Sequence, residues 1–175
     1  MISAFRHRLA ADQRGAAVIE LAIIAPIFAL MTIGVVDMSN AYSRKLALEQ
    51  GAQRAIEKIM QTTANDTVEN TLATEVVCQV NGTDPSGNCL TSPITTANVT
   101  VTFRLECNSG GTITSQTTTD PTTFDAMTCA SGTPSRYIQV GVTDKYTPMF
   151  PIHFAAYNTS DGTYHLSATA GMRTQ

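Results

Sequence analysis

The sequence predicts an α+β protein in which a long N-terminal helix packs on a small antiparallel β-sheet. Three observations predict it: an apolar run at residues 16–36, an Ala-rich stretch of helical periodicity that follows it, and a Thr-rich remainder with short alternating segments. The 175 residues leave room for one compact domain with an appendage, but not for two full domains. Charged residues make up only 14% of the chain, well below the roughly 25% of an average soluble domain.

The apolar run, residues 16–36, has Glu20 as its only charge and Thr32 as its only other polar side chain. As a helix these 21 residues span about 31 Å, the thickness of a bilayer hydrocarbon core. A buried core helix of this size would keep a polar face, so a membrane-spanning helix is the better interpretation. Three arginines precede the run, and the positive-inside rule then places the N-terminus in the cytoplasm and the larger portion across the bilayer.

A secretory signal peptide is the main alternative for this segment. Its apolar stretch would be only about 7–15 residues long and would end at a small-x-small cleavage site. The run here is longer, and Gly15 stands directly before it. A cut after Gly15 would remove a short basic leader, residues 1–15, and would make Ala16 the first residue of a mature chain that keeps its apolar helix.

Glu20 places a carboxylate in an apolar helix, where an unpaired charge is costly in lipid. Cleavage would create an ammonium group at Ala16, and Glu20 of one subunit could then neutralise the Ala16 amine of an axially offset neighbour. The alternative is that Glu20 extends to the headgroups, which its short side chain disfavours. Pro26 lies mid-span and cannot donate to the carbonyl of Ala22. We therefore expect a kink there, either as a hinge for leaving lipid or as a tolerated irregularity.

Beyond the apolar run the helix is expected to continue to about Met60. Its apolar residues recur at helical spacing and should form one stripe that packs against the exported domain. The stripe consists of Leu48, Ala52, Ala55 and Ile59.

From residue 61 onward Thr is frequent, and the segment 61–175 carries only four basic residues. Period-two alternation with Val and Thr predicts strands at residues 75–80, 98–105, 136–142 and 163–168. In the second of these, Val99, Val101, Phe103 and Leu105 should face the helix. Residues 108–135, rich in Gly, Ser, Thr and Pro, are expected to form a long loop, and residues 146–151 an extended or turn connection.

All four cysteines lie in the portion predicted to be exported, where an oxidising compartment favours disulfides. Three connectivities are possible. The sequential pairing Cys78–Cys89 and Cys107–Cys129 is the one we expect, because it ties down two loops rich in Gly, Pro and Asn. A zinc site is the alternative, but the sequence has no Cys-x-x-Cys pair and no His close to any Cys.

Other function classes have little support. No segment is basic enough for a nucleic-acid surface. The sequence has no phosphate-binding Gly-rich loop, no Gly-x-Ser-x-Gly elbow and no His-Glu-x-x-His helix. Outside the leader the only histidines are His153 and His165, which have no obvious nucleophile. We therefore expect no catalysis, no metal and no cofactor, with a small membrane-tethered enzyme as a distant alternative.

Residues 14–26 read Arg-Gly-Ala-Ala-Val-Ile-Glu-Leu-Ala-Ile-Ile-Ala-Pro. They resemble the N-terminus of TadE-like pseudopilins, which belong to the tight-adherence (Flp-type) branch of type IV pilus systems. The similarity continues through residues 34–37 and 46–55, and so covers roughly residues 12–60. The resemblance implies that a prepilin peptidase cuts between Gly15 and Ala16 and that the product assists pilus assembly. Leu21 after Glu20 and the long C-terminal portion differ from the main Flp pilin and favour a minor, pseudopilin-type subunit.

The sequence therefore predicts a minor pilin that supports pili used in surface attachment. It would consist of a leader (1–15), a helix (16–60) and an exported β domain (61–175). It would lie in the bacterial inner membrane with its C-terminal domain in the periplasm, or in the extracellular pilus. Its expected partners are the prepilin peptidase, other pilins or pseudopilins, the assembly platform and the lipid bilayer. The alternative is an uncleaved, single-span surface domain that binds a ligand.

Overall fold

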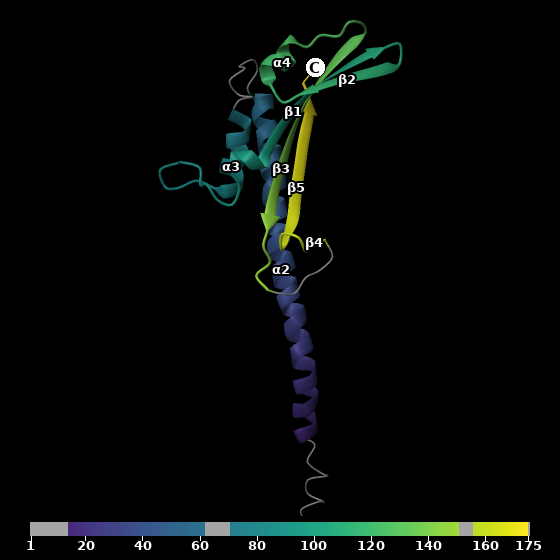
Figure 1. Cartoon of the computed structure of the whole chain (residues 1–175). Helices are drawn as coiled ribbons and strands as arrows, with labels where there is room; N and C mark the ends of the chain where they lie inside the picture. The colour runs from purple at the N-terminus through teal and green to yellow at the C-terminus, as the bar shows by residue number, and fades with distance from the viewer. Residues whose placement is uncertain (1–13, 62–70, 151–155, 175) are drawn as a thin grey trace, which may run out of the picture.

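The computed structural model describes residues 14–61, 71–150 and 156–174. It has the predicted α+β architecture (Figure 1). The helices are α2 (Arg14–Gln61), α3 (Leu72–Asn81) and α4 (Pro121–Ala126), with a short 3-10 turn η2 (Thr96–Asn98). The strands are β1 (Val99–Ser109), β2 (Thr112–Thr118), β3 (Thr133–Tyr146), β4 (Tyr157–Asn158) and β5 (Thr163–Arg173).

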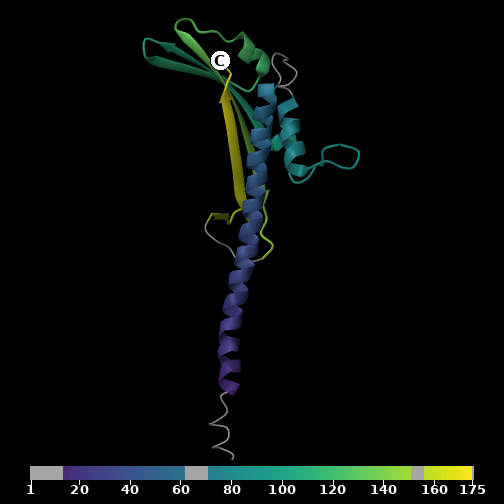
Figure 2. The same ribbon diagram turned by 180° about the vertical axis from the view of Figure 1, so that it is seen from behind.

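The 48-residue helix α2 has two halves with different surroundings. Its C-terminal half lies along the sheet with α3 beside it, whereas its N-terminal half extends beyond the rest of the molecule (Figures 1 and 2). The helix predicted for residues 16–60 is confirmed as one continuous element. At a rise of about 1.5 Å per residue it is about 72 Å long.

The five strands form one antiparallel sheet in the order β2-β1-β3-β5-β4. The long strands β1, β3 and β5 form its centre, and one face packs on α2. In β1, Phe103 and Leu105 are buried while Arg104 between them is exposed, as the alternation predicts. The two-layer arrangement leaves the opposite face of the sheet without a covering helix (Figure 2).

The predicted stripe on α2 forms the centre of the core. Leu48, Ala52 and Ala55 are completely buried, and Ile59 packs against the same cluster. Small residues allow the neighbouring elements to approach α2 closely. At Gly51 an added Cβ would lie 2.6 Å from Cγ2 of Val80 in α3.

The predicted strand at residues 75–80 is wrong, because these residues lie in α3. The buried residues of α3 are Leu72, Val76 and Val77, which share one face of a helix. The six-residue window 75–80, with Val at positions 76, 77 and 80, fits either period, and the deciding residue, Leu72, lies outside that window. Packing against α2 therefore overrides the β propensity of valine.

The long loop predicted at residues 108–135 is also largely wrong, since this stretch contains the end of β1, all of β2 and α4. Gly110 and Gly111 both have positive φ and form a tight hairpin turn. Asp120 caps α4 by accepting a hydrogen bond from the amide of Thr123 at 3.0 Å, and Phe124 is buried beneath it. Composition alone predicted a loop because β2 is polar on both faces.

Candidate functional site: the bare helix and its collar

The N-terminal half of α2 exposes a large apolar surface, which we call the bare half and define as residues 18–36. Val18, Leu21 and Phe28 are about two-thirds exposed, although such side chains are normally buried. The other exposed large apolar side chains of the bare half are Ile19, Ile23, Ile24, Ile27, Leu30, Met31, Val35 and Val36.

Among the described residues α2 is the one helix long and apolar enough to cross a membrane. Only 6% of its most apolar window is buried. A core helix of a soluble protein passes the same composition test but is mostly covered by its own fold. The exposure therefore favours an apolar environment, lipid or a neighbouring helix, around the bare half.

The polar side chains of the bare half differ in how they are satisfied. The hydroxyl of Thr32 donates to the carbonyl oxygen of Phe28 at 2.7 Å, so it needs no partner outside the helix. Glu20 is exposed and takes part in none of the ion pairs formed within the described part of the chain. Glu20 is thus the charge in this half for which the described part of the chain supplies no counter-ion.

Gly15 and Ala16 lie in the first turn of α2. The preceding leader, residues 1–13, lies outside the described residues. The helix continues through Pro26 without interruption, so the kink expected there stays a prediction.

Polar contacts join α2 to the sheet domain at the point where the bare half ends. We call these contacts the collar and define it by Asp37 and Arg44 of α2 with their partners. The first contact is made by Asp37. This carboxylate is 3% exposed and accepts three hydrogen bonds from the last residue of β3 and from the chain that follows it. The donors are the backbone amides of Met149 (2.9 Å) and Phe150 (3.0 Å) and the hydroxyl of Tyr146 (3.2 Å). Burial and the hydrogen bond to Asp37 raise the pKa of the Tyr146 phenol above its usual value.

Two turns further along α2, Arg44 makes the second contact of the collar. Its Nε lies 2.7 Å from Oδ2 of Asp144, a carboxylate on β3 that is 7% exposed. The other oxygen of Asp144 accepts from the amide of Lys145 at 2.8 Å. Removing one member of such a pair would leave the other charge buried and unpaired, so this contact fixes the position of the helix against the sheet.

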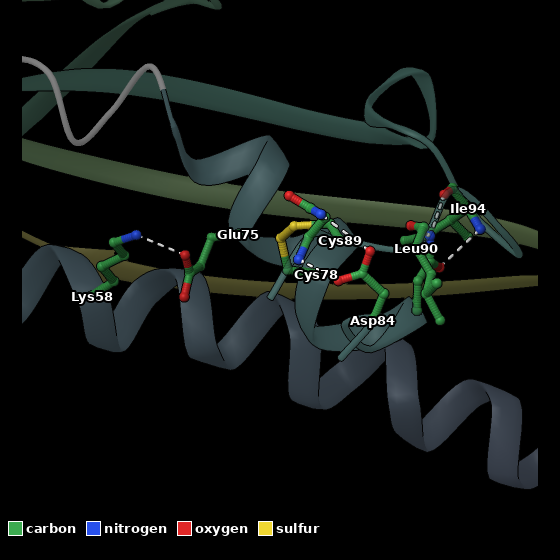
Figure 3. The surroundings of a disulfide bond; sticks show 9 residues. Lys58, Glu75, Cys78, Asp84, Cys89, Leu90 and Ile94 are labelled. Atoms are coloured by element: carbon green, nitrogen blue, oxygen red, sulfur yellow. Dashed lines mark hydrogen bonds and ion pairs between the residues drawn. A yellow bond between two sulfur atoms is a disulfide. The ribbon is translucent and has the colours of Figure 1, made fainter. Parts of the chain in front are cut away.

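At the far end of α2, a second ion pair joins Lys58 to Glu75 of α3 at 2.6 Å (Figure 3). Beyond it the disulfide Cys78–Cys89 ties the end of α3 to the following loop, within which Asp84 accepts hydrogen bonds from two backbone amides. The second disulfide joins Cys107 to Cys129. These are the two sequential pairs expected from the sequence.

Of the two histidines of the enzyme alternative, the structure describes one. His153 lies outside the described residues. Nε2 of His165 lies 2.6 Å from Oδ2 of Asp161, which Lys145 also contacts at 2.8 Å. The hydrogen bonds from Lys145 and His165 hold the pKa of the exposed Asp161 carboxyl well below its usual value. Among the described residues no cluster of His, Cys, Asp or Glu could hold a metal ion.

The collar is what reasoning from the sequence missed. A signal existed for Asp37, because it is the first charge after the apolar run. Its hydrogen-bond partners follow more than a hundred residues later, and no local pattern connects the two segments.

The comparison with known proteins gives a match over the bare half of α2 and over most of the part of α2 that packs on the sheet domain. Residues 15–56 match the family model described as TadE-like protein. The match begins at the glycine of the predicted cleavage site and confirms the resemblance found for residues 12–60. No curated protein and no solved structure matches the chain.

Proposed function

We propose that this chain is a prepilin-processed minor pilin, a pseudopilin, that supports assembly of tight-adherence (Flp-type) pili used in surface attachment. The observation that carries the proposal is the bare half of α2. It is an exposed apolar helix, it lies within the TadE-like match, and its one charge, Glu20, has no counter-ion among the described ion pairs.

The bare half would act in two environments in turn. Its length and exposure suit a membrane anchor, which keeps the subunit in the bacterial inner membrane with residues 1–15 in the cytoplasm and residues 61–175 in the periplasm. After the prepilin peptidase cuts between Gly15 and Ala16, the same surface packs against the helices of other pilins or pseudopilins on the assembly platform. Apolar side chains serve both environments without a change of conformation.

Glu20 would select the protein environment over the lipid one. In lipid its carboxylate is costly, whereas beside a neighbour it neutralises the Ala16 ammonium group created by cleavage. The collar has the complementary task of holding α2 against the sheet through Asp37 and Arg44, so that force on the helix is passed to the exported domain. In this scheme no residue has a catalytic role.

The test separates assembly from processing. Glu20→Ala should still insert and be cleaved, but its co-purification with other pilus subunits should fall at least about ten-fold, because the neighbour's ammonium stays unpaired. Glu20→Gln should be intermediate, since an amide accepts a hydrogen bond without a charge, and Glu20→Asp should retain part of the function. Thr32→Val is the matched control, because the Thr32 hydroxyl bonds only within its own helix in the described structure.

Normal co-purification of Glu20→Ala would refute the pairing of Glu20 with the Ala16 amine. It would favour the alternative in which the Glu20 side chain extends to the lipid headgroups. A wild-type chain that keeps its leader would instead support the uncleaved single-span surface domain.

A further inference from the structure

The end of the sheet domain nearest the bare half carries apolar side chains that are exposed in the described part of the chain. We call this surface the rim and define it by Met38 and Tyr42 of α2 and by Met149 and Phe150 after β3. Met149 is 69% exposed, Tyr42 61% and Met38 49%, whereas Phe150 is half-buried. None of them belongs to the apolar run that predicts the membrane span.

The rim surrounds α2. Met149 lies on the side of Asn40, whose amide donates to the Met149 sulfur at 3.5 Å. Met38 and Tyr42 project from the other side of the helix and line an apolar groove of about 750 Å³. Tyr164 and Leu166 of β5 form the opposite wall of the groove. The groove also includes Val35, so its surface is continuous with the bare half.

The height of the rim follows from the helix geometry. Residues 16–36 fill the roughly 30 Å hydrocarbon core of a bilayer, so Asp37 stands at the boundary of that core. The amide of Met149 is 2.9 Å from the Asp37 carboxylate, which holds Met149 at the same level. Tyr42 is five residues further on, about 7.5 Å, at the outer edge of a headgroup layer that is about 5–7 Å thick.

The chemistry of the rim suits this layer. Tyrosine is enriched at membrane interfaces, where its ring lies at headgroup level. The Asp37 carboxylate would be unfavourable beside lipid, but it is 3% exposed and its oxygens accept three hydrogen bonds.

We propose that the rim is a membrane-docking surface: Met149, Phe150 and the groove beside Met38 and Tyr42 lie in the headgroup layer and upper acyl chains of the phospholipid leaflet on the exported side. The sheet domain then stands directly on the bilayer, with no flexible spacer between them. The hydrogen bonds of Asp37 fix this height. The proposal rests on the membrane anchoring proposed above.

Because the chain contains no tryptophan, a single introduced Trp is an unambiguous fluorescent reporter. The probe is the full chain in nanodiscs of phosphatidylethanolamine and phosphatidylglycerol, with or without brominated phosphatidylcholine. The bromine lies near the headgroup end of the acyl chains for Met149→Trp and near their methyl end for Phe28→Trp, and the control variant is measured with both lipids. Met149→Trp reports on the rim, and Phe28→Trp reports on the bare half. Ile113→Trp is the matched control, because Ile113 is 62% exposed but lies in β2, at the opposite end of the molecule from the bare half (Figure 1).

The proposal predicts that brominated lipid quenches Met149→Trp and Phe28→Trp at least about two-fold and leaves Ile113→Trp unchanged. Quenching of Phe28→Trp without quenching of Met149→Trp would overturn the docking surface and leave the membrane anchor intact. Absence of quenching at Phe28→Trp would overturn the anchor and the docking surface together. Met38→Trp carries the same prediction as Met149→Trp, should the latter variant fail to fold.

A protein neighbour is the competing occupant of the rim. A Met149→Trp signal that lipid does not quench, but that co-purified pilus subunits shield from a water-soluble quencher, would assign the rim to a subunit contact and refute lipid docking.

Discussion

Replacing Asp37 by alanine should separate the packed half of α2 from the chain that follows β3. The substitution removes one buried carboxylate and leaves three donors without their acceptor, namely the amides of Met149 and Phe150 and the hydroxyl of Tyr146. Hydrogen bonds to a charged group contribute about 1.5–3 kcal/mol each. Because Met149 is 69% exposed, water can reach part of this site once it opens. We therefore expect a net loss of about 2–4 kcal/mol in the free energy of unfolding, below the sum of the three contributions.

The assay is urea unfolding of the full chain in detergent, followed by tyrosine fluorescence. With a slope of about 2 kcal/mol per molar urea, the midpoint should fall by roughly 1–2 M. Asp37→Asn keeps one acceptor oxygen and should lose about half as much. Glu57→Ala is the control on the same helix, since its exposed pair with Arg54 at 3.5 Å should contribute less than about 0.5 kcal/mol. If Asp37→Ala proves no more destabilising than Glu57→Ala, the collar does not hold the helix, and the reasoning is refuted.

Three further predictions concern the packing of α2 and the sheet domain, all measured as urea midpoints. Replacing both Cys107 and Cys129 by serine should cost about 3 kcal/mol, because their bond closes a loop with a separation of 22 residues; a midpoint equal to that of the oxidised wild type would contradict this. Gly51→Ala should destabilise by about 1 kcal/mol although alanine favours helices, because its Cβ would meet Val80 at 2.6 Å. In a Val80→Ala background it should stabilise, and destabilisation there would rule out the clash. The lowered pKa of Asp161 means that its contribution to stability is complete above the usual carboxyl pKa of 3.8 and is lost as the pH falls through the lower folded value. The urea midpoint of Asp161→Asn should therefore lie below that of the wild type at about pH 6, and the difference should shrink towards about pH 2.5. A difference that grows as the pH falls would contradict a stabilising role of the Asp161 carboxylate.

The elements that could be predicted from the sequence are those with a strong local period. The α2 stripe repeats over several turns, and β1 alternates without interruption from Val99 to Leu105, so both are identified by their own residues. α3 could not be recognised in this way. Its valines favour a strand, and only the α2 surface beside Leu72 and Val76 selects a helix.

The same distinction applies to the candidate site. Gly15, Ala16 and Glu20 belong to one short motif, so their roles could be predicted from the order of the residues, and these roles stay predictions. The collar could not, because Arg44 and Asp144 are separated by 100 residues. Nothing in the residues around Asp144 indicates that it faces a helix formed so much earlier in the chain, so this contact becomes visible only in the folded structure.

The intact mass of the protein purified from its native membrane tests the central claim most directly. A prepilin-processed subunit should have lost residues 1–15 and should begin with Ala16 at a free or modified amine, with the whole of the apolar run retained. The Gly15→Ala variant should keep its leader, because the peptidase must approach an extended backbone that lacks a Cβ. A wild-type chain that retains residues 1–15, or one that is cut after the apolar run, would contradict the account.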